Sequence, residues 1–367
     1  MMKKVKKILK IVAILIAAFI ILGILFVMVM RACNYLHHKI MYKHGVNESS
    51  YIELNGQKQF VTIKGENRNN PVIIYLHGGP GGADSYMNYC FSDYLTDEYT
   101  VVSWDQRGCG RTYYKNAKAD PLNKTVTFSQ SLEDLDALVK YVCDKLNQES
   151  VIIMGHSYGT VLGSVYANSH EDLVKAYIGV GQFISIEDGD LYSYEDALKK
   201  AKESNMDTKD LEKAYENYCN KPGIMSLIAL RQESDKYHPV TKKADQFGRA
   251  LFSPSAGILD LKWFMKQMTD TQEYVLLNHD LFEYTLAFNA YDRLDYSMPV
   301  CFISGEQDFV CPLDSVSKYY EAVNSPLKKM YIIKDCGHDV HYANPREFCE
   351  DVKEFLTQSE KSPTSNR

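Results

Sequence analysis

The pentapeptide Gly-His-Ser-Tyr-Gly at positions 155–159 has the pattern G-x-S-x-G. It follows the apolar run Val151–Met154 and precedes a helical pattern that starts near Thr160. A serine on the sharp turn between a strand and a helix has an exposed hydroxyl, and glycines beside it leave room for the neighbouring backbone. We therefore predict that Ser157 is a nucleophile. The alternative is a glycine-containing turn whose serine only caps the helix.

A second glycine-rich segment, His-Gly-Gly-Pro-Gly at positions 77–81, directly follows the apolar run Val72–Leu76. Acyl transfer requires backbone N–H groups aimed at the oxyanion that develops on the substrate carbonyl. Where a serine occupies such an elbow, one donor follows the nucleophile and the other lies in an earlier loop. We predict that the amides of Tyr158 and Gly79 form this oxyanion hole. His77 is predicted to structure the loop rather than act as a base, and a simple turn is the alternative for the segment.

The remaining partners of a serine nucleophile are expected downstream, in the order acid and then histidine. The acid that we predict is Asp308, just past the strand-like run 300–303, with Glu306 as a competitor. The base that we predict is His338, in the loop after the last strand-like run, with His341 as a rival. Both positions follow the carboxyl ends of strands, where the functional groups of open α/β sheets gather.

These residues define a reaction. His338 would accept the proton of Ser157 while Asp308 orients the imidazole ring, and the amides of Gly79 and Tyr158 would hold the oxyanion. Water would then hydrolyse the acyl-enzyme. This chemistry needs no metal and no organic cofactor. The nine cysteines show no close spacing that indicates a zinc site.

The elements that would position these residues alternate between strands and helices. Apolar runs and a turn at Asn55-Gly56 predict strands at 51–54, 59–64, 72–76, 99–104, 151–154, 177–180, 300–303 and 330–333. Helical spacing predicts helices at 128–146, 161–169, 316–323 and 345–356. Such alternation predicts an α/β fold with a mainly parallel, doubly wound sheet.

One interval, residues 184–296, contains no strand-like run. Its helical patterns fall at 194–202, 211–219, 225–230, 260–268 and 274–281. We predict that it is a helical cap inserted into a core made of residues 49–183 and 297–357. Residues 358–367 are polar and are predicted to form a disordered tail.

The N-terminal segment is apolar. Residues 11–30 contain no charge and no proline, and twenty residues of helix are about 30 Å long, enough to cross a bilayer. The alternatives are a cleaved signal peptide, a lipoprotein signal cleaved before Cys33, and a buried core helix. We predict a basic N-terminus at 1–10, a transmembrane helix at 11–30 and a juxtamembrane linker at 31–48.

Flanking charge predicts how this helix is oriented. Five lysines precede the apolar run, and three basic residues, Arg31, Lys39 and Lys43, follow it. Positive residues favour the cytoplasmic side. We therefore expect a single-pass protein of the cell membrane with a cytoplasmic N-terminus and an extracytoplasmic catalytic domain. Residues 44–367 contain 33 basic and 47 acidic residues, a balance that argues against nucleic-acid binding.

The segment 77–81, together with Trp-Asp-Gln-Arg-Gly-Cys-Gly-Arg-Thr at 104–112, resembles the prolyl aminopeptidase (proline iminopeptidase) family of α/β-hydrolases. With the elbow and the loops of Asp308 and His338, the resemblance covers residues 50–356 apart from the cap. It implies a serine peptidase that removes an N-terminal residue, often proline, from short peptides. It also implies that Asp105 and Arg107 support the oxyanion loop rather than act as catalysts.

In this family, cap glutamates bind the free α-amino group of the substrate. The candidates here are Glu187, Glu195, Glu233, Glu273 and Glu283, although a solvated helix face is the more frequent explanation of each such glutamate.

The leading hypothesis is a membrane-anchored aminopeptidase that acts on small peptides. An esterase or amidase acting on small acyl or lipid-like substrates is the alternative. A ligand-binding receptor without turnover is a third. The sequence does not specify an oligomeric state.

Overall fold

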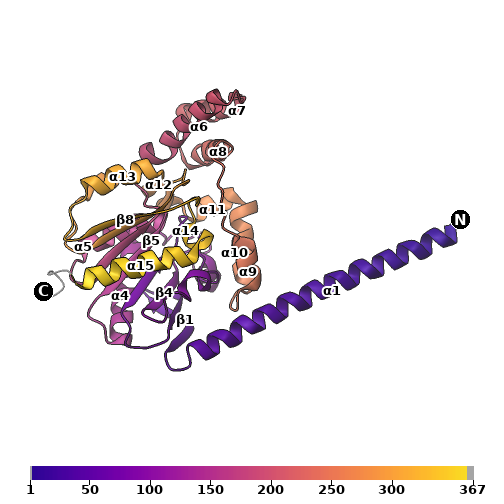
Figure 1. Ribbon diagram of the computed structural model, residues 1–367, viewed down its shortest axis with the longest axis horizontal. Coiled ribbons are helices and arrows are strands. Elements are labelled where there is room, and N and C mark those ends of the chain that lie inside the picture. Colours follow the sequence, from indigo (N-terminus) through magenta and orange to yellow (C-terminus); the bar gives the residue numbers. More distant parts are fainter. Residues whose placement is uncertain (1, 362–367) are drawn as a thin grey trace.

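A sheet of eight strands forms the centre of the molecule (Figure 1). The computed structural model describes residues 2–361. The strands lie in the order β1-β2-β4-β3-β5-β6-β7-β8; all pairs from β4 to β8 are parallel, and β2 is antiparallel to both β1 and β4. Their bounds are β1 Val46–Leu54, β2 Gln57–Gly65, β3 Val72–Leu76, β4 Thr100–Asp105, β5 Val151–His156, β6 Val174–Val180, β7 Val300–Gly305 and β8 Lys328–Ile333. The predicted mainly parallel sheet is confirmed.

Helices cover both faces of this sheet. The strand β3 is buried along its whole length, and its neighbours Ile73 and Ile74 enter two different hydrophobic clusters. Side chains alternate between the faces of a strand, so each cluster fills one side. The flanking helices are α2 Tyr89–Ser92, α3 Gly110–Asn116, α4 Phe128–Leu146, α5 Tyr158–Ser169, α13 Leu313–Ala322, α14 Val340–Ala343 and α15 Pro345–Glu360.

The helix α4 has the bounds that the sequence predicts, because both of its ends carry local signals. The Thr127 hydroxyl accepts a hydrogen bond from the Gln130 amide at 3.1 Å and caps the first turn. Asn147 ends the helix in the left-handed conformation, with φ of 53°.

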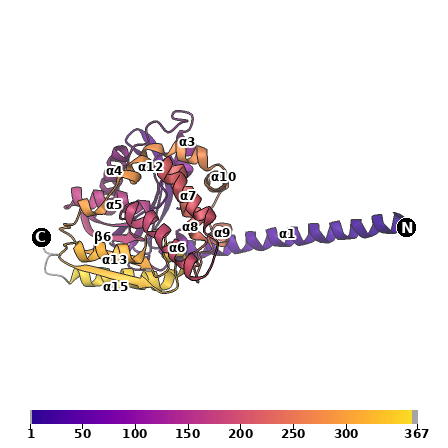
Figure 2. The same cartoon turned by 90° about the horizontal axis from the view of Figure 1, so that it is seen from above.

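Helices fill the chain between β6 and β7 (Figure 2). They are η1 Glu187–Leu191, α6 Tyr192–Glu203, α7 Lys209–Asn220, α8 Ile224–Asp235, α9 Gln246–Phe252, α10 Ile258–Thr269, α11 Thr271–Leu277, α12 His279–Ala287 and η2 Ala290–Asp292. We refer to this interval as the cap. The single helix predicted at 274–281 is wrong, because the chain breaks at Asn278 into α11 and α12.

The N-terminal helix α1 runs from Met2 to Met41, and its N-terminal part projects away from the rest of the molecule (Figure 1). It is long and apolar enough to cross a membrane, a property shared by signal sequences and some core helices. The predicted linker at 31–48 is wrong. Residues 31–44 contain neither proline nor glycine, so the helix continues to Met41, and β1 begins at Val46.

The C-terminal helix α15 extends to Glu360, so residues 358–360 of the predicted disordered tail are helical. Residues 362–367 of that predicted tail lie outside the described residues.

Candidate active site

Ser157 lies on a strained turn between β5 and α5. Its φ of 53° and ψ of −121° are unusual for a residue with a side chain, a conformation of the kind that costs about 1–3 kcal/mol and is concentrated at functional sites. The flanking glycines make the turn possible. A Cβ atom at Gly155 would lie 2.3 Å from the Gly159 carbonyl oxygen, and one at Gly159 would lie 2.1 Å from the Leu76 carbonyl oxygen.

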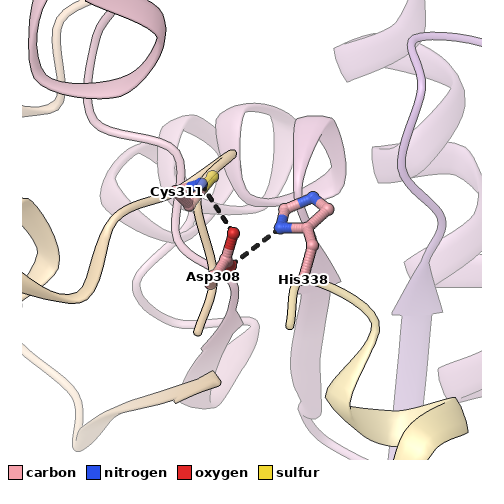
Figure 3. A group of neighbouring side chains, drawn as sticks. All are labelled: Asp308, Cys311 and His338. Atoms are coloured by element: carbon pink, nitrogen blue, oxygen red, sulfur yellow. Dashed lines mark hydrogen bonds and ion pairs between the residues drawn. The ribbon is translucent and has the colours of Figure 1, made fainter. Parts of the chain in front are cut away.

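Asp308 and His338 form a hydrogen-bonded pair (Figure 3). Asp308 Oδ2 lies 2.8 Å from His338 Nδ1. The other carboxylate oxygen, Oδ1, accepts hydrogen bonds from the amides of Val310 and Cys311 at 2.8 and 2.9 Å. Burial alone would lower the pKa of His338, but the negative charge and the hydrogen bond of Asp308 outweigh it, and the pKa is raised. The carboxylate is thus positioned to stabilise an imidazolium.

The loop of His338 lies next to the serine turn. The ring centroids of His338 and His156, the residue before Ser157, are 4.8 Å apart, and His156 Nε2 donates to the His338 carbonyl oxygen at 3.2 Å. Among the described residues, the Ser157 hydroxyl has no hydrogen bond to His338. Contacts between nucleophile and base are often looser without substrate. The arrangement therefore places Ser157, His338 and Asp308 at one edge of the sheet.

The two predicted oxyanion donors also belong to this edge. The Tyr158 amide is in the first turn of α5, where backbone N–H groups are free and the helix dipole is positive. Gly79 follows β3 with φ of 123°. A Cβ atom on the adjacent Gly78 would lie 3.2 Å from Ser157 Cβ, so this loop passes close to the nucleophile. Within residues 2–361, neither amide has a hydrogen-bond partner.

Cap side chains hold the loop 78–81 in place. The Trp263 indole N–H donates to the Gly81 carbonyl oxygen at 2.8 Å, and the Gln267 side-chain amide donates to the same oxygen at 3.2 Å. The Tyr274 hydroxyl donates to the Pro80 carbonyl oxygen. These contacts could not be predicted from the sequence, because the partners lie more than 180 residues apart and carry no local signal.

His77 has a structural environment. Its Nδ1 donates to the Gly78 carbonyl oxygen at 2.8 Å, and its Nε2 accepts the Gln106 amide at 3.4 Å. Burial lowers the pKa of His77 to about 4. The ring is neutral at pH 7 and both nitrogens are occupied, so it shapes the loop.

The two rival residues lie apart from the Asp308–His338 pair. Glu306 is exposed, and its Oε2 accepts the Asp335 amide at 3.1 Å. His341 is fully buried, with Nε2 3.2 Å from the Tyr75 hydroxyl, and burial holds the pKa of His341 well below its ordinary value.

Asp105 and Arg107 support the loop after β4. Asp105 is buried and its Oδ2 accepts the Arg111 amide at 2.9 Å. Arg107 forms a buried, bidentate ion pair with Asp134, with Nε–Oδ2 and Nη2–Oδ1 distances of 2.6 and 2.9 Å. The Arg107 guanidinium and the Oδ2 atom of Asp105 are thus both bonded within the protein.

The cap glutamates do not converge on the nucleophile as a buried group. Four are exposed and Glu233 is half-buried; the exposed ones are Glu187, Glu195, Glu273 and Glu283. The buried cap carboxylate beside the site is Asp190, which pairs with Arg231 at 2.7 and 2.9 Å. The Arg231 charge acts to lower the pKa of His338, so the pair lies within electrostatic reach of the base. No sequence pattern indicates this pair.

Cys311 lies beside Asp308 and His338 (Figure 3), and the three potential metal-ligand atoms lie within 4.8 Å of one another. Burial raises the pKa of the Cys311 thiol well above its ordinary value. This disfavours the thiolate that would bind a metal.

A cleft of about 620 Å³ opens between α6 and the loop after β7, and Asp308, Phe309 and His238 are among its lining residues. A larger hollow of about 840 Å³ lies at the opposite edge of the sheet, beside the first residues of β3 and β6. The smaller cleft is the one that borders the acid of the site.

Comparisons with known proteins agree with the fold described above. Residues 71–219 match the family described as alpha/beta hydrolase fold. The chain is 23% identical over 320 residues to "Probable aminopeptidase YbaC" of Bacillus subtilis (strain 168), covering 81% of this chain and 92% of that protein. It is 22% identical over 295 residues to a proline iminopeptidase of Lactobacillus delbrueckii subsp. bulgaricus, covering 78% of this chain and 90% of that protein.

Solved structures share the fold. A proline iminopeptidase from Mycobacterium smegmatis matches with a TM-score of 0.58 and 18% identity, covering 86% of this chain and 99% of that one. A bacterial membrane phospholipase A matches with a TM-score of 0.60 and 15% identity, covering 99% of each chain. The chain therefore has the α/β-hydrolase fold and is similar in sequence to the proline iminopeptidases.

Proposed function

We propose that this protein is a membrane-anchored serine hydrolase that releases N-terminal residues, of the proline type, from short peptides. The observation that supports it most is the Asp308–His338 pair beside the strained serine turn. The similarity to an aminopeptidase and to proline iminopeptidases supports the peptidase specificity.

In the proposed reaction, Ser157 Oγ attacks the substrate carbonyl carbon while His338 Nε2 takes the hydroxyl proton. Asp308 keeps the remaining imidazole proton on Nδ1 and stabilises the charged ring. The amides of Gly79 and Tyr158 bind the oxyanion. His338 then gives its proton to the leaving amine. In the second half of the reaction, His338 takes a proton from water while the water oxygen attacks the acyl carbon, and it returns that proton to Ser157 Oγ as the acid product leaves.

A second candidate is an esterase or amidase that acts on acyl or lipid-like substrates. It is favoured by α1, which is long and apolar enough to hold the catalytic domain next to a bilayer. Prolyl para-nitroanilide and short-chain nitrophenyl esters, assayed side by side, separate the two. Rapid ester turnover without release of N-terminal proline would replace the peptidase proposal by this second one.

We further propose that α1 crosses the cell membrane with its N-terminus in the cytoplasm, because the lysines before the apolar run outnumber the basic residues after it. Protease added to intact cells should then digest the catalytic domain. If the domain is digested only after the cells are broken, the orientation is the opposite of the one proposed.

A fluorophosphonate probe tests the nucleophile. We expect it to label the wild-type protein and not Ser157→Ala. Ser169→Ala, an exposed serine at the end of the same helix, is the matched control and should be labelled like the wild type. Labelling of Ser157→Ala would overturn the assignment. A folded wild-type protein that does not react would favour the receptor without turnover.

A further inference from the structure

The helix α10 exposes a stripe of large apolar side chains. Ile258, Leu261, Met265 and Met268 are 64, 54, 45 and 66% exposed. Their spacing of three and four residues places them on one face of the helix. The opposite face is buried through Asp260 and Trp263. We call these four side chains the α10 stripe. Such a contiguous apolar stripe on a surface helix indicates a contact with another apolar phase.

The start of α10 is fixed next to the apolar part of α1. The rings of Phe26 and Phe252 meet edge to face, with centroids 5.9 Å apart. More than one helical turn after Phe26, the Arg31 guanidinium donates to the Ala256 carbonyl oxygen. The Asn34 side-chain amide donates to the Phe252 carbonyl oxygen at 2.9 Å. The segment 252–256 leads directly into α10.

These contacts set the depth of the cap segment. Phe26 belongs to the uncharged run 11–30, and Arg31 is the first charged residue after it. At 1.5 Å per residue, Phe26 lies about 7–8 Å further into the apolar run than Arg31. If α1 crosses a bilayer, Arg31 lies near the headgroups. The segment that touches both residues must therefore lie at the boundary between headgroups and acyl chains.

The orientation of α10 keeps its stripe at this depth. In both views α9 and α10 lie on the side of the molecule from which α1 projects, and α10 runs across the direction of α1 (Figures 1 and 2). Lys262 is exposed beside the stripe. A helix with an apolar face and flanking lysine is typical of segments that lie in the interfacial plane.

We propose that the α10 stripe is a lipid-contact surface, which inserts into the outer boundary of the same bilayer that α1 crosses. The proposal rests on the membrane anchorage proposed above and adds a second contact, between the cap and the lipid. Each side chain of the stripe would exchange water for acyl chain on insertion.

Tryptophan reporters in proteoliposomes test the proposal. The two native tryptophans, Trp104 and Trp263, are buried. The fluorescence of a tryptophan added on the surface is therefore obtained by subtracting the wild-type emission. The full-length variant Met268→Trp is reconstituted in phosphatidylcholine with or without brominated acyl chains. We expect bromine to remove about half or more of the added emission, because interfacial helices bury their apolar face about 5–10 Å into this region.

Two variants provide the controls. Met206→Trp, at a cap methionine that is 50% exposed between α6 and α7, should keep its emission. Phe19→Trp, in the middle of the apolar run, should be quenched if α1 spans the bilayer.

Quenching of Phe19→Trp without quenching of Met268→Trp would overturn the lipid contact and leave the anchor in place. Equal quenching of Met268→Trp and Met206→Trp would also overturn it, because the contact would not be specific to the stripe. A shift of the Met268→Trp emission that depends on protein density instead of bromine would assign the stripe to a second copy of the chain. Fluorophosphonate labelling in the same vesicles reports the hydrolase chemistry separately.

Discussion

Replacement of Asp308 by asparagine tests the proposed acid most directly. In the structure, Oδ1 accepts hydrogen bonds from the amides of Val310 and Cys311, whereas Oδ2 faces His338 Nδ1. An asparagine side chain can satisfy both amides only if its oxygen takes the Oδ1 position. Its NH₂ group then points at His338 Nδ1, which must become an acceptor.

The imidazole proton therefore moves to Nε2, the atom that has to accept the Ser157 proton. The loss of the correct tautomer and of the charge that stabilises the imidazolium predicts a decrease in kcat/KM of about 10⁴-fold, or about 5 kcal/mol. The variant should remain folded, because the two amide contacts are kept.

The pH profile gives an independent readout. Activity requires neutral His338, and Asp308 raises the pKa of this residue above its ordinary value of 6.5. In the wild type kcat/KM should therefore fall as the pH decreases through that raised pKa. In Asp308→Asn the charge and the hydrogen bond of Asp308 that raise this pKa are lost, so the acid limb should move to lower pH.

The assay is hydrolysis of a chromogenic prolyl amide or ester by the purified full-length protein, between pH 5 and pH 9 at about 25 °C. Glu306→Gln is the matched control, since Glu306 follows the same strand and its side chain accepts the Asp335 amide, away from His338. We expect it to change kcat/KM by no more than about twofold. An Asp308→Asn protein within tenfold of the wild type, or a large loss in Glu306→Gln, would refute the assignment.

Three further predictions concern the support of the site. Asp134→Ala leaves the buried Arg107 guanidinium without its ion-pair partner, so the free energy of unfolding measured in urea should fall by about 3–5 kcal/mol. An unchanged midpoint of urea unfolding would contradict this prediction. Burial raises the pKa of Asp84 from 3.8 to about 7, so the wild-type fold loses stability as the pH rises through this range. The Asp84→Asn variant lacks this loss. The difference in Tm between the variant and the wild type should therefore increase from pH 3.8 to about 7, and a constant difference would contradict this. Trp263→Phe removes the indole N–H that donates to the Gly81 carbonyl oxygen. The loss of this hydrogen bond, about 0.5–1.5 kcal/mol, should lower kcat/KM by about tenfold or less. A change confined to KM would argue against a role of Trp263 in positioning the oxyanion loop.

The sequence predicted the parts of the molecule whose signals are local. A short apolar run such as Val72–Leu76 is typical of a strand that is buried on both faces, and its bounds agree with those of β3. Asp308 and His338 could be chosen because each follows a strand, and parallel strands bring their carboxyl ends to one edge.

The parts that were missed depend on contacts between distant segments. The Asp190–Arg231 pair joins η1 to α8, and the Trp263 contact joins α10 to the loop after β3. The local sequence around Asp190, Arg231 and Trp263 does not differ from that of an ordinary helix. The length of α1 was underestimated because an apolar run shows which part of a helix is apolar and not where the helix ends. Asn34 and His38 continue that helix along the folded domain, where His38 Nε2 lies 2.7 Å from Asp93 Oδ2.

The indole of Trp263 gives the protein a built-in optical probe. Its N–H is bonded to a carbonyl of the loop that carries Gly79, and the other tryptophan, Trp104, donates to the Gln59 side chain in the core at 2.8 Å. In a Trp104→Phe background, emission would come from one indole at the contact between cap and oxyanion loop. Stopped-flow fluorescence would then report whether this contact changes during turnover, without any added label.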